Sequence, residues 1–179
     1  LTDAQLVARA TVMEGHADNV SACLLGGLTV AHWDTLEDVR AVSLPVHPEV
    51  TAIVAVPDAQ LATTHARGML PAQVPYSDAV FNASRAATLI AAMTYDPGLL
   101  LEATADRLHQ DYRREAYAQS MALVGQLRSQ GWAAAISGAG PSVLVLTTRD
   151  RAQQAVAAAS RGGFQASEPG ITPYGAHVI

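Results

Sequence analysis

Apolar residues recur at helical spacing over the first 13 residues, and a capping box opens this predicted helix. Thr2 is a good N-cap and Gln5 follows three positions later, ahead of an apolar series formed by Leu6, Ala10 and Met13. A second, shorter helix is predicted over residues 16–27, where a pair of glycines ends it.

Three strand-like runs follow the two predicted helices. Residues 28–33 (LTVAHW) and 39–45 (VRAVSLP) have the pattern of paired strands, closed by a proline. Residues 50–57 (VTAIVAVP) are apolar throughout and rich in β-branched side chains. This last pattern is typical of a strand that is covered on both faces.

Helical patterns return after residue 60. A short helix or turn is expected over 62–70 and a long helix over 76–94, capped by Ser77 or Asp78, with one buried stripe made of Val80, Ala83, Ala87 and Ile90. One or two helices are expected over 97–111. A further helix is expected over 113–130, with the inward residues Tyr117, Met121, Val124 and Leu127.

The rest of the chain reads as strand, loop and strand over 133–146, a helix over 150–161 and an extended piece over 163–179. From residue 50 onward, the order of elements is therefore β-α-β-β-α-β. This order predicts an α+β ferredoxin-like sandwich, with an antiparallel sheet and helices on one face. The segment before residue 46 does not belong to that plan, so the predicted domains are 1–45 and 46–179.

Composition and charge narrow the function classes. Half of the 179 residues are hydrophobic, and 11 basic against 16 acidic residues give a net charge of −5, which argues against a nucleic-acid partner. The single cysteine, Cys23, excludes an internal disulfide and is expected to be a small buried hydrophobe. The pattern contains neither a membrane span nor a signal peptide, which predicts no membrane partner and a cytoplasmic protein.

The first chemistry-bearing stretch is EGHADN at residues 14–19, which places Glu14, His16 and Asn19 just before an apolar helix. One interpretation is helix capping by Asp18 or Asn19. The other is a phosphate site, since a helix N-terminus attracts anions and a nearby carboxylate can hold Mg²⁺ together with substrate phosphates.

Two arginine-bearing stretches are candidates for binding a carboxylate. ATTHARGMLP at 62–71 contains Thr63 and Arg67, and an arginine there is either a solvated charge or a bidentate carboxylate ligand. RLHQDYRRE at 107–115 holds three arginines, and the residues alone do not choose among Arg107, Arg113 and Arg114.

A glycine loop is predicted at SGAGPS, where the candidate residues are Ser137, Gly138, Ala139, Gly140 and Ser142. The glycines permit positive φ and a close approach of backbone to ligand. A strand follows the loop, the third glycine of a dinucleotide fingerprint is missing, and so is the Lys-[Ser/Thr] pair of a P-loop. Neither of those two nucleotide-binding mechanisms fits.

In this order, EGHADNVSACLLGG, TTHARGMLP and ISGAGPSVLVL resemble motifs of the homoserine kinases in the GHMP kinase superfamily. The resemblance covers essentially the whole chain. It implies a GHMP-kinase C-terminal ferredoxin-like sandwich, preceded by a remnant of the N-terminal domain. It also implies transfer of the ATP γ-phosphate, with Mg²⁺, to the side-chain hydroxyl of L-homoserine in threonine biosynthesis, and it suggests a homodimer.

The resemblance also implies roles for single residues. Glu14 would contact Mg²⁺, and His16 and Asn19 would lie at the substrate and phosphate site. Arg67, with Thr63 one turn earlier, would bind the substrate carboxylate, and Arg107 is the nearest match to the second carboxylate-binding arginine. Asn82 matches a position common in the family, where its amide must be satisfied inside the protein.

The chain departs from the family at its N-terminus, because the superfamily's main phosphate loop, P-x-x-x-G-L-G-S-S-A, is not in it. We therefore expect a C-terminal portion of the enzyme that has no kinase activity alone. The alternatives are another GHMP small-molecule kinase, such as one acting on mevalonate or a sugar, and a non-catalytic ligand-binding or dimerisation module.

Overall fold

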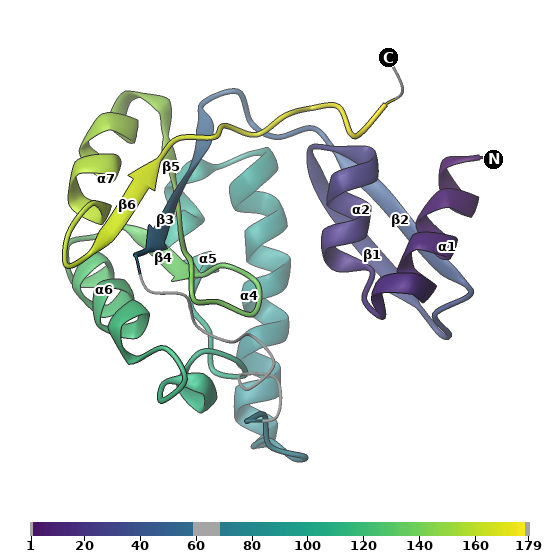
Figure 1. Ribbon diagram of the computed structural model, residues 1–179, viewed down its shortest axis with the longest axis horizontal. Coiled ribbons are helices and arrows are strands. Elements are labelled where there is room, and N and C mark those ends of the chain that lie inside the picture. Colours follow the sequence, from purple (N-terminus) through teal and green to yellow (C-terminus); the bar gives the residue numbers. More distant parts are fainter. Residues whose placement is uncertain (1, 59–68, 178–179) are drawn as a thin grey trace. The chain divides into compact units, whose positions relative to one another are not determined.

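The computed structural model describes residues 2–58 and 69–177, and these residues divide into two compact units (Figure 1). The first unit is Leu1–Val46 together with Ile171–Ile179, and the second is His47–Gly170. The first boundary is one residue away from the one that we predicted. The prediction had placed residues 171–179 with the second unit, and the structure instead groups them with the first.

The first unit consists of two helices and a hairpin. Helix α1 spans Asp3–Glu14, α2 spans Asp18–Leu25, and the antiparallel strands are β1 (Leu28–Trp33) and β2 (Val39–Leu44). The capping box is confirmed: the Thr2 side chain accepts a hydrogen bond from the backbone N–H of Gln5, and the Gln5 side chain accepts one from the backbone N–H of Thr2.

The core of the first unit uses a different face of α1 from the one that the apolar pattern predicted. Val7 and Thr11 are the buried residues of α1, whereas Met13 is 89% exposed. Val7 packs with Ala17 and with Val39 of β2. The expectation of a buried Cys23 is also wrong, because this side chain is exposed on α2.

The segment after residue 170 is held against the C-terminal end of α2. The backbone N–H of Ala176 donates to the carbonyl of Cys23 at 2.8 Å, and the N–H of Gly27 donates to the carbonyl of Thr172 at 2.8 Å. The last carbonyls of a helix have no partner within it, so the first of these bonds satisfies one of them. The fit leaves no room at Gly26, where a Cβ would lie 2.4 Å from the carbonyl carbon of Tyr174.

The second unit is built on a four-stranded antiparallel sheet in the order β4-β5-β3-β6, as the sandwich prediction requires. Its strands are β3 (Val50–Pro57), β4 (Ala133–Ile136), β5 (Val143–Thr148) and β6 (Phe164–Ser167). The first strand of this unit, β3, thus lies between its third and fourth strands, β5 and β6. This is the strand order of the ferredoxin-like plan.

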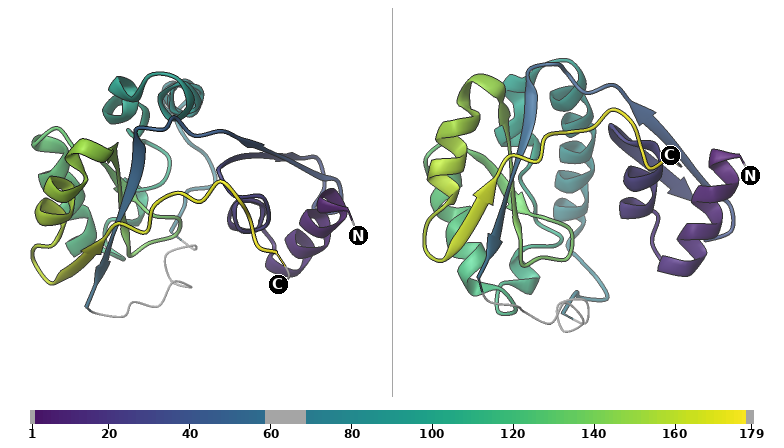
Figure 2. Two further views of the ribbon diagram at one scale, coloured as in Figure 1. Left: turned by 90° about the horizontal axis from the view of Figure 1, so that it is seen from above. Right: turned by 45° about the horizontal axis from the view of Figure 1, so that its top comes forward.

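Two helices, α6 (Ala118–Ser129) and α7 (Ala152–Ala159), cover one face of this sheet (Figure 2). The main core lies between these layers, and its sheet residues include Ile53, Val143 and Val145, which are fully buried. The inward side of α6 is as predicted, since Met121, Val124 and Leu127 are all buried.

Helix α4 (Tyr76–Thr94) lies beyond the opposite face of the sheet and presents a different side from the predicted one. No side chain caps it, since its N-cap is Pro75. Of the predicted stripe, Val80 is 50% exposed, Ala83 and Ala87 are exposed, and Ile90 is only partly buried. The side that faces the sheet carries Asn82, Arg85, Ala86 and Leu89. Alanine-rich helices have two similar sides, and periodicity alone does not say which one is covered.

The chain between α4 and α6 is mostly turns. It contains a 3-10 turn at Pro97–Leu99, the short helix α5 (Leu100–Ala103) and a second 3-10 turn at Asp111–Arg113. Arg128 of α6 ties α5 to the sheet: its guanidinium donates to the carbonyls of Leu101 (2.8 Å) and Ala134 (3.0 Å). Among the residues that the structure describes, no helix is long and apolar enough to cross a membrane.

The packing at Gly26 predicts a large cost for an added methyl group there. Gly15 and Gly26 both have positive φ, +82° and +70°, but a Cβ at Gly15 would meet nothing within 4 Å. We expect Gly15→Ala to lower the free energy of unfolding by about 1–2 kcal/mol, which is the cost of left-handed backbone alone. Gly26→Ala should cost more, because its backbone (φ +70°, ψ −179°) is one that essentially only glycine adopts and because its Cβ would meet Tyr174. It should also release residues 171–177 to proteolysis, which a backbone cost alone would not do. Denaturant unfolding measures the difference, and equal losses would contradict this account of the close packing.

Candidate active site

The EGHADN motif forms the turn between α1 and α2 in the first unit. Glu14 is the last residue of α1, His16 lies in the turn and Asn19 is in the first turn of α2, and all three are exposed. The turn is made possible by Gly15, at φ +82°. Within this turn, Oδ1 of Asp18 accepts a hydrogen bond from the backbone N–H of Asn19 at 2.7 Å. The three candidate side chains are therefore on one short turn.

The glycine loop lies in the second unit and joins β4 to β5, which confirms the strand-loop-strand context. The N–H of Ser137 donates to the carbonyl of Ser142 at 2.8 Å, and the N–H of Gly140 donates to the carbonyl of Ser137 at 2.9 Å. Gly138 and Gly140 have φ of +55° and +80°, so both use the freedom that only glycine has. Ala139 lies at the tip of this closed loop and is partly buried.

The loop is packed against the start of α6. A Cβ at Gly140 would lie 3.0 Å from the ring of Tyr117, closer than ordinary van der Waals contact, so a larger residue would push this ring aside. The hydroxyl of Ser120 donates to the carbonyl of Pro141 at 2.6 Å. Burial raises the pKa of the Tyr117 phenol, and the nearby positive charge of Arg113 partly offsets this rise.

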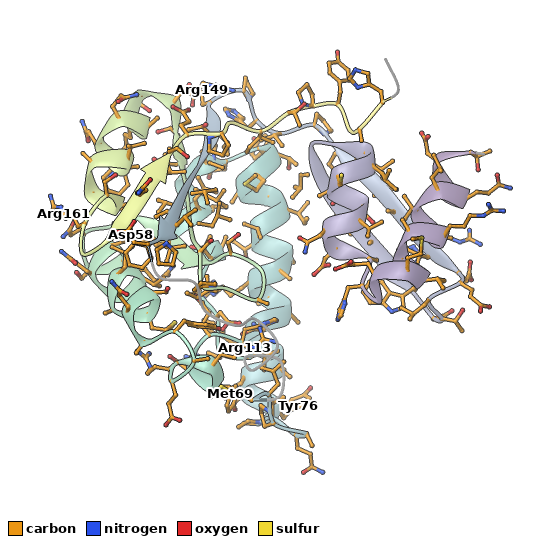
Figure 3. The ribbon with its side chains drawn as sticks, viewed as in Figure 1. Asp58, Met69, Tyr76, Arg113, Arg149 and Arg161 are labelled. Carbon is orange, nitrogen blue, oxygen red and sulfur yellow. The ribbon has the colours of Figure 1, made fainter. Side chains whose placement is uncertain are left out.

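The three arginines of the 107–115 stretch have different environments. Arg107 is exposed: its Nη1 lies 3.4 Å from Oδ1 of Asp78, and its guanidinium stacks 4.0 Å from the ring centre of Phe81. Arg114 is also exposed and is paired with Asp111. Arg113, labelled in Figure 3, is only 6% exposed. Its Nη1 lies 3.3 Å from Nδ1 of His109. Arg113 is thus the buried cation of the stretch, and the sequence alone did not single it out.

A hydrogen-bonded carboxylate anchors the turn that carries Arg113. The Asp106 side chain accepts bonds from Nδ2 of Asn82 (2.8 Å) and from the backbone N–H groups of Leu108, His109 and Gln110 (3.2, 2.9 and 2.8 Å). Burial by itself raises the pKa of Asp106, but the four hydrogen bonds favour the charged form. The net result is a pKa below the ordinary value of 3.8.

A cavity of about 370 Å³ lies between α4 and the face of the sheet opposite to α6 and α7. Its walls include Leu144 and Leu146, which alternate along β5 with the core residues Val143 and Val145 and so point to the opposite face. Asp106 and Tyr117 line the cavity, as does Gly138 of the glycine loop.

Two predicted site residues, Thr63 and Arg67, lie outside the described residues. The others divide between the units: Glu14, His16 and Asn19 belong to the first, and Arg107 and the glycine loop belong to the second. In the described ranges 2–58 and 69–177, no group of three or more His, Cys, Asp or Glu residues is arranged to hold a metal ion. A single exposed carboxylate such as Glu14 fits Mg²⁺ only in the manner of kinases, where substrate phosphates and waters complete the shell.

The family comparison matches the part of the chain that contains Arg113 and the glycine loop. Residues 81–164, from α4 to the start of β6, match the model of the GHMP kinases C terminal family. This part of the chain is therefore similar to the C-terminal domain of GHMP kinases. The matched residues include β4, β5, α6 and α7 of the second unit, whereas strand β3 precedes them. The predicted α+β fold is confirmed.

Relatives and solved structures extend the match beyond this domain. The homoserine kinase of Streptomyces coelicolor is 46% identical over all 179 residues, which make up 57% of that protein's length. The crystal structure of homoserine kinase from Cytophaga hutchinsonii superposes with a TM-score of 0.72 at 25% identity, over 88% of this chain and 51% of that one. A protein of similar fold at 16% identity, with a TM-score of 0.58 over 96% of this chain and 61% of its own, is solved with AMPPCP and magnesium.

The lowered pKa of Asp106 predicts a pH-dependent contribution to stability. The folded-state pKa lies below the unfolded value of 3.8, so the contribution is complete above about pH 4 and is lost as the pH falls through the folded-state pKa. We expect Asp106→Asn to lower the free energy of unfolding by about 1–3 kcal/mol at pH 7. The difference from the unmodified chain should shrink below pH 4.

Denaturant unfolding between pH 3 and pH 7 measures this effect. Asp111→Asn is the matched control, since Asp111 lies in the same segment but is 63% exposed in its side chain. An Asp106→Asn difference that stays constant down to pH 3 would contradict the assignment.

Proposed function

We propose that this chain is part of a homoserine kinase, which transfers the γ-phosphate of ATP to the side-chain hydroxyl of L-homoserine and forms O-phospho-L-homoserine for threonine biosynthesis. The observation that carries the proposal is the 46% identity to the Streptomyces coelicolor homoserine kinase along the whole chain. Because the chain spans 57% of that relative, the activity is proposed for the whole protein.

The substrate's carboxylate needs arginines, and Arg113 suits this role better than Arg107. Arg107 is already paired with Asp78 at the surface, where water screens its charge. Arg113 is buried in a turn that hydrogen bonds hold on several sides, so its guanidinium keeps a defined position. A fixed, water-poor guanidinium binds a carboxylate with less loss of conformational entropy than a mobile one. We therefore propose Arg67 and Arg113 as the carboxylate-binding pair.

Phosphoryl transfer depends mainly on positioning and on cations around the phosphate, so no strongly basic side chain is needed. The homoserine hydroxyl oxygen attacks the γ-phosphorus, the bond to the bridging oxygen breaks, ADP leaves, and the hydroxyl proton passes to solvent. We assign Glu14 to Mg²⁺, and His16 and Asn19 to the hydroxyl and phosphate. When bound, Mg²⁺ would neutralise part of the phosphate charge.

The glycine loop is assigned to closing the site rather than to holding ATP. Its backbone is bonded to itself through Ser137, Ser142 and Gly140, and its two glycines have no side chain to keep a ligand away. Thr63 is assigned to the substrate together with Arg67.

The proposal is tested by ATP consumption in the presence of homoserine. The full-length protein should form ADP and O-phospho-L-homoserine and should be inactive with mevalonate. The 179-residue chain by itself should show no homoserine-dependent turnover, because the superfamily's phosphate loop is not in its sequence. Turnover of mevalonate but not homoserine would reject the proposal, and turnover by the chain alone would reject the assignment of ATP to a segment outside it.

The choice between the two arginines is tested by matched substitutions in the full-length protein. Arg113→Gln should raise the KM for homoserine about 10- to 100-fold, since a charged hydrogen bond to the carboxylate is lost. Arg107→Gln should change it little, because an exposed pair with Asp78 contributes little. The steady-state KM for homoserine and for ATP measures both effects. The reverse order would return the role to Arg107.

A further inference from the structure

Asn82 and Asp106 form a reciprocal clasp between α4 and the segment that follows α5. Nδ2 of Asn82 donates to Oδ1 of Asp106 at 2.8 Å, and Oδ1 of Asn82 accepts from the backbone N–H of Arg107 at 2.8 Å. The amide thus uses one donor and its acceptor on two consecutive residues. An amide in this place satisfies both ends at once, which neither an alanine nor a carboxylate can do.

The clasp continues into the turn that carries Arg113. The Asp106 carboxylate also accepts from the backbone N–H groups of His109 and Gln110, which precede the 3-10 turn at Asp111–Arg113. The ring of His109 then lies 3.3 Å from Nη1 of Arg113. Each of these bonds removes freedom from the backbone between Asp106 and Arg113, so the direction of the buried guanidinium depends on the clasp.

The same segment also holds the glycine loop at both of its ends. The Gln110 side chain accepts a hydrogen bond from the backbone N–H of Ile136 at 2.8 Å, one residue before the loop. At the other end, Tyr117 packs on Gly140 and Ser120 bonds to Pro141. Residues 106–120 therefore connect α4 to the glycine loop through the arginine turn. The clasp attaches this segment to α4, beside the exposed contacts of Arg107 with Asp78 and Phe81.

We propose that Asn82 and Asp106 are positioning residues that hold Arg113 and the glycine loop in fixed positions relative to each other for the reaction. This inference rests on the proposed function, since it assigns Arg113 to the substrate carboxylate. The physical reason is the sensitivity of phosphoryl transfer to geometry: a shift of about 1 Å in a positioning group can cost on the order of a hundredfold in rate. The clasp prevents such a shift at a place distant from the reacting atoms.

A clasp that only stabilised the fold would give a different result from one that positions the site. A loss of stability alone lowers the melting temperature and the amount of folded enzyme, but the folded fraction keeps its KM. A loss of position changes the KM for homoserine and kcat in the folded enzyme while the KM for ATP stays nearly unchanged. Kinetics under conditions where every variant is folded separates the two.

The experiment uses four variants of the full-length protein: Asn82→Ala, Asn82→Asp, Asp106→Asn and the exchange variant Asn82→Asp/Asp106→Asn. Asn82→Asp places two carboxylates face to face, and the exchange variant restores one amide–carboxylate pair with its direction reversed. Ser84→Ala on exposed α4 surface and Asp111→Asn in the same segment are the controls.

We expect the three single variants to raise the KM for homoserine on the order of 10- to 100-fold, with a fall in kcat. The exchange variant should recover part of this loss, and the controls should match the unmodified enzyme. A double variant whose defect equals the product of the two single defects, or single variants that lower only the melting temperature, would overturn the inference while leaving the proposed function intact.

Amide hydrogen exchange on the 179-residue chain gives a readout that needs no activity. Asn82→Ala should reduce protection of residues 107–117 and of the loop 137–142 together, with α7 unchanged. Loss of protection in only one of the two segments would also overturn the inference. An unmodified enzyme that fails to phosphorylate homoserine would reject the proposed function and the role of Arg113, and the exchange measurement would still decide whether the clasp orders both segments.

Discussion

The second unit depends on one partly buried carboxylate that is fully engaged in hydrogen bonds. Asp106 lies in a stretch with little regular structure, where backbone N–H groups have no helix or strand to pair with. Its two oxygens collect three of these N–H groups and the amide of Asn82. A single side chain thus replaces the hydrogen bonds of a missing helix turn. These hydrogen bonds favour the charged carboxylate and therefore lower the pKa of Asp106.

The sheet explains why such an anchor is needed. Helices α6 and α7 cover one face with a continuous core that includes Ile53, Val143 and Val145. The other face is covered less tightly, and a cavity of about 370 Å³ remains between it and α4. Apolar packing therefore holds the 104–117 segment mainly at its end, where Tyr117 is buried with Met121. Directed hydrogen bonds position it, and these specify geometry more sharply than apolar contacts do.

Identity to homoserine kinases bears on the reaction, while the structure bears on which arginine is fixed and buried. Arg107, the nearest match in the sequence, is a surface residue that Asp78 and Phe81 already engage. Spacing in a turn-rich stretch is a weak guide, because one residue of offset rotates a side chain to another side of the segment.

The sequence by itself determined the ferredoxin-like plan, the capping box at Thr2 and the loop between β4 and β5, because these follow from local periodicity and from the residues that turns require. Tertiary structure decided which side of α4 faces the sheet, that Cys23 is exposed and that Arg113 is the buried arginine. Those outcomes depend on contacts between segments far apart in the chain. An alanine-rich helix or a run of three arginines contains no local signal for its neighbour, so only the assembled packing selects the buried side.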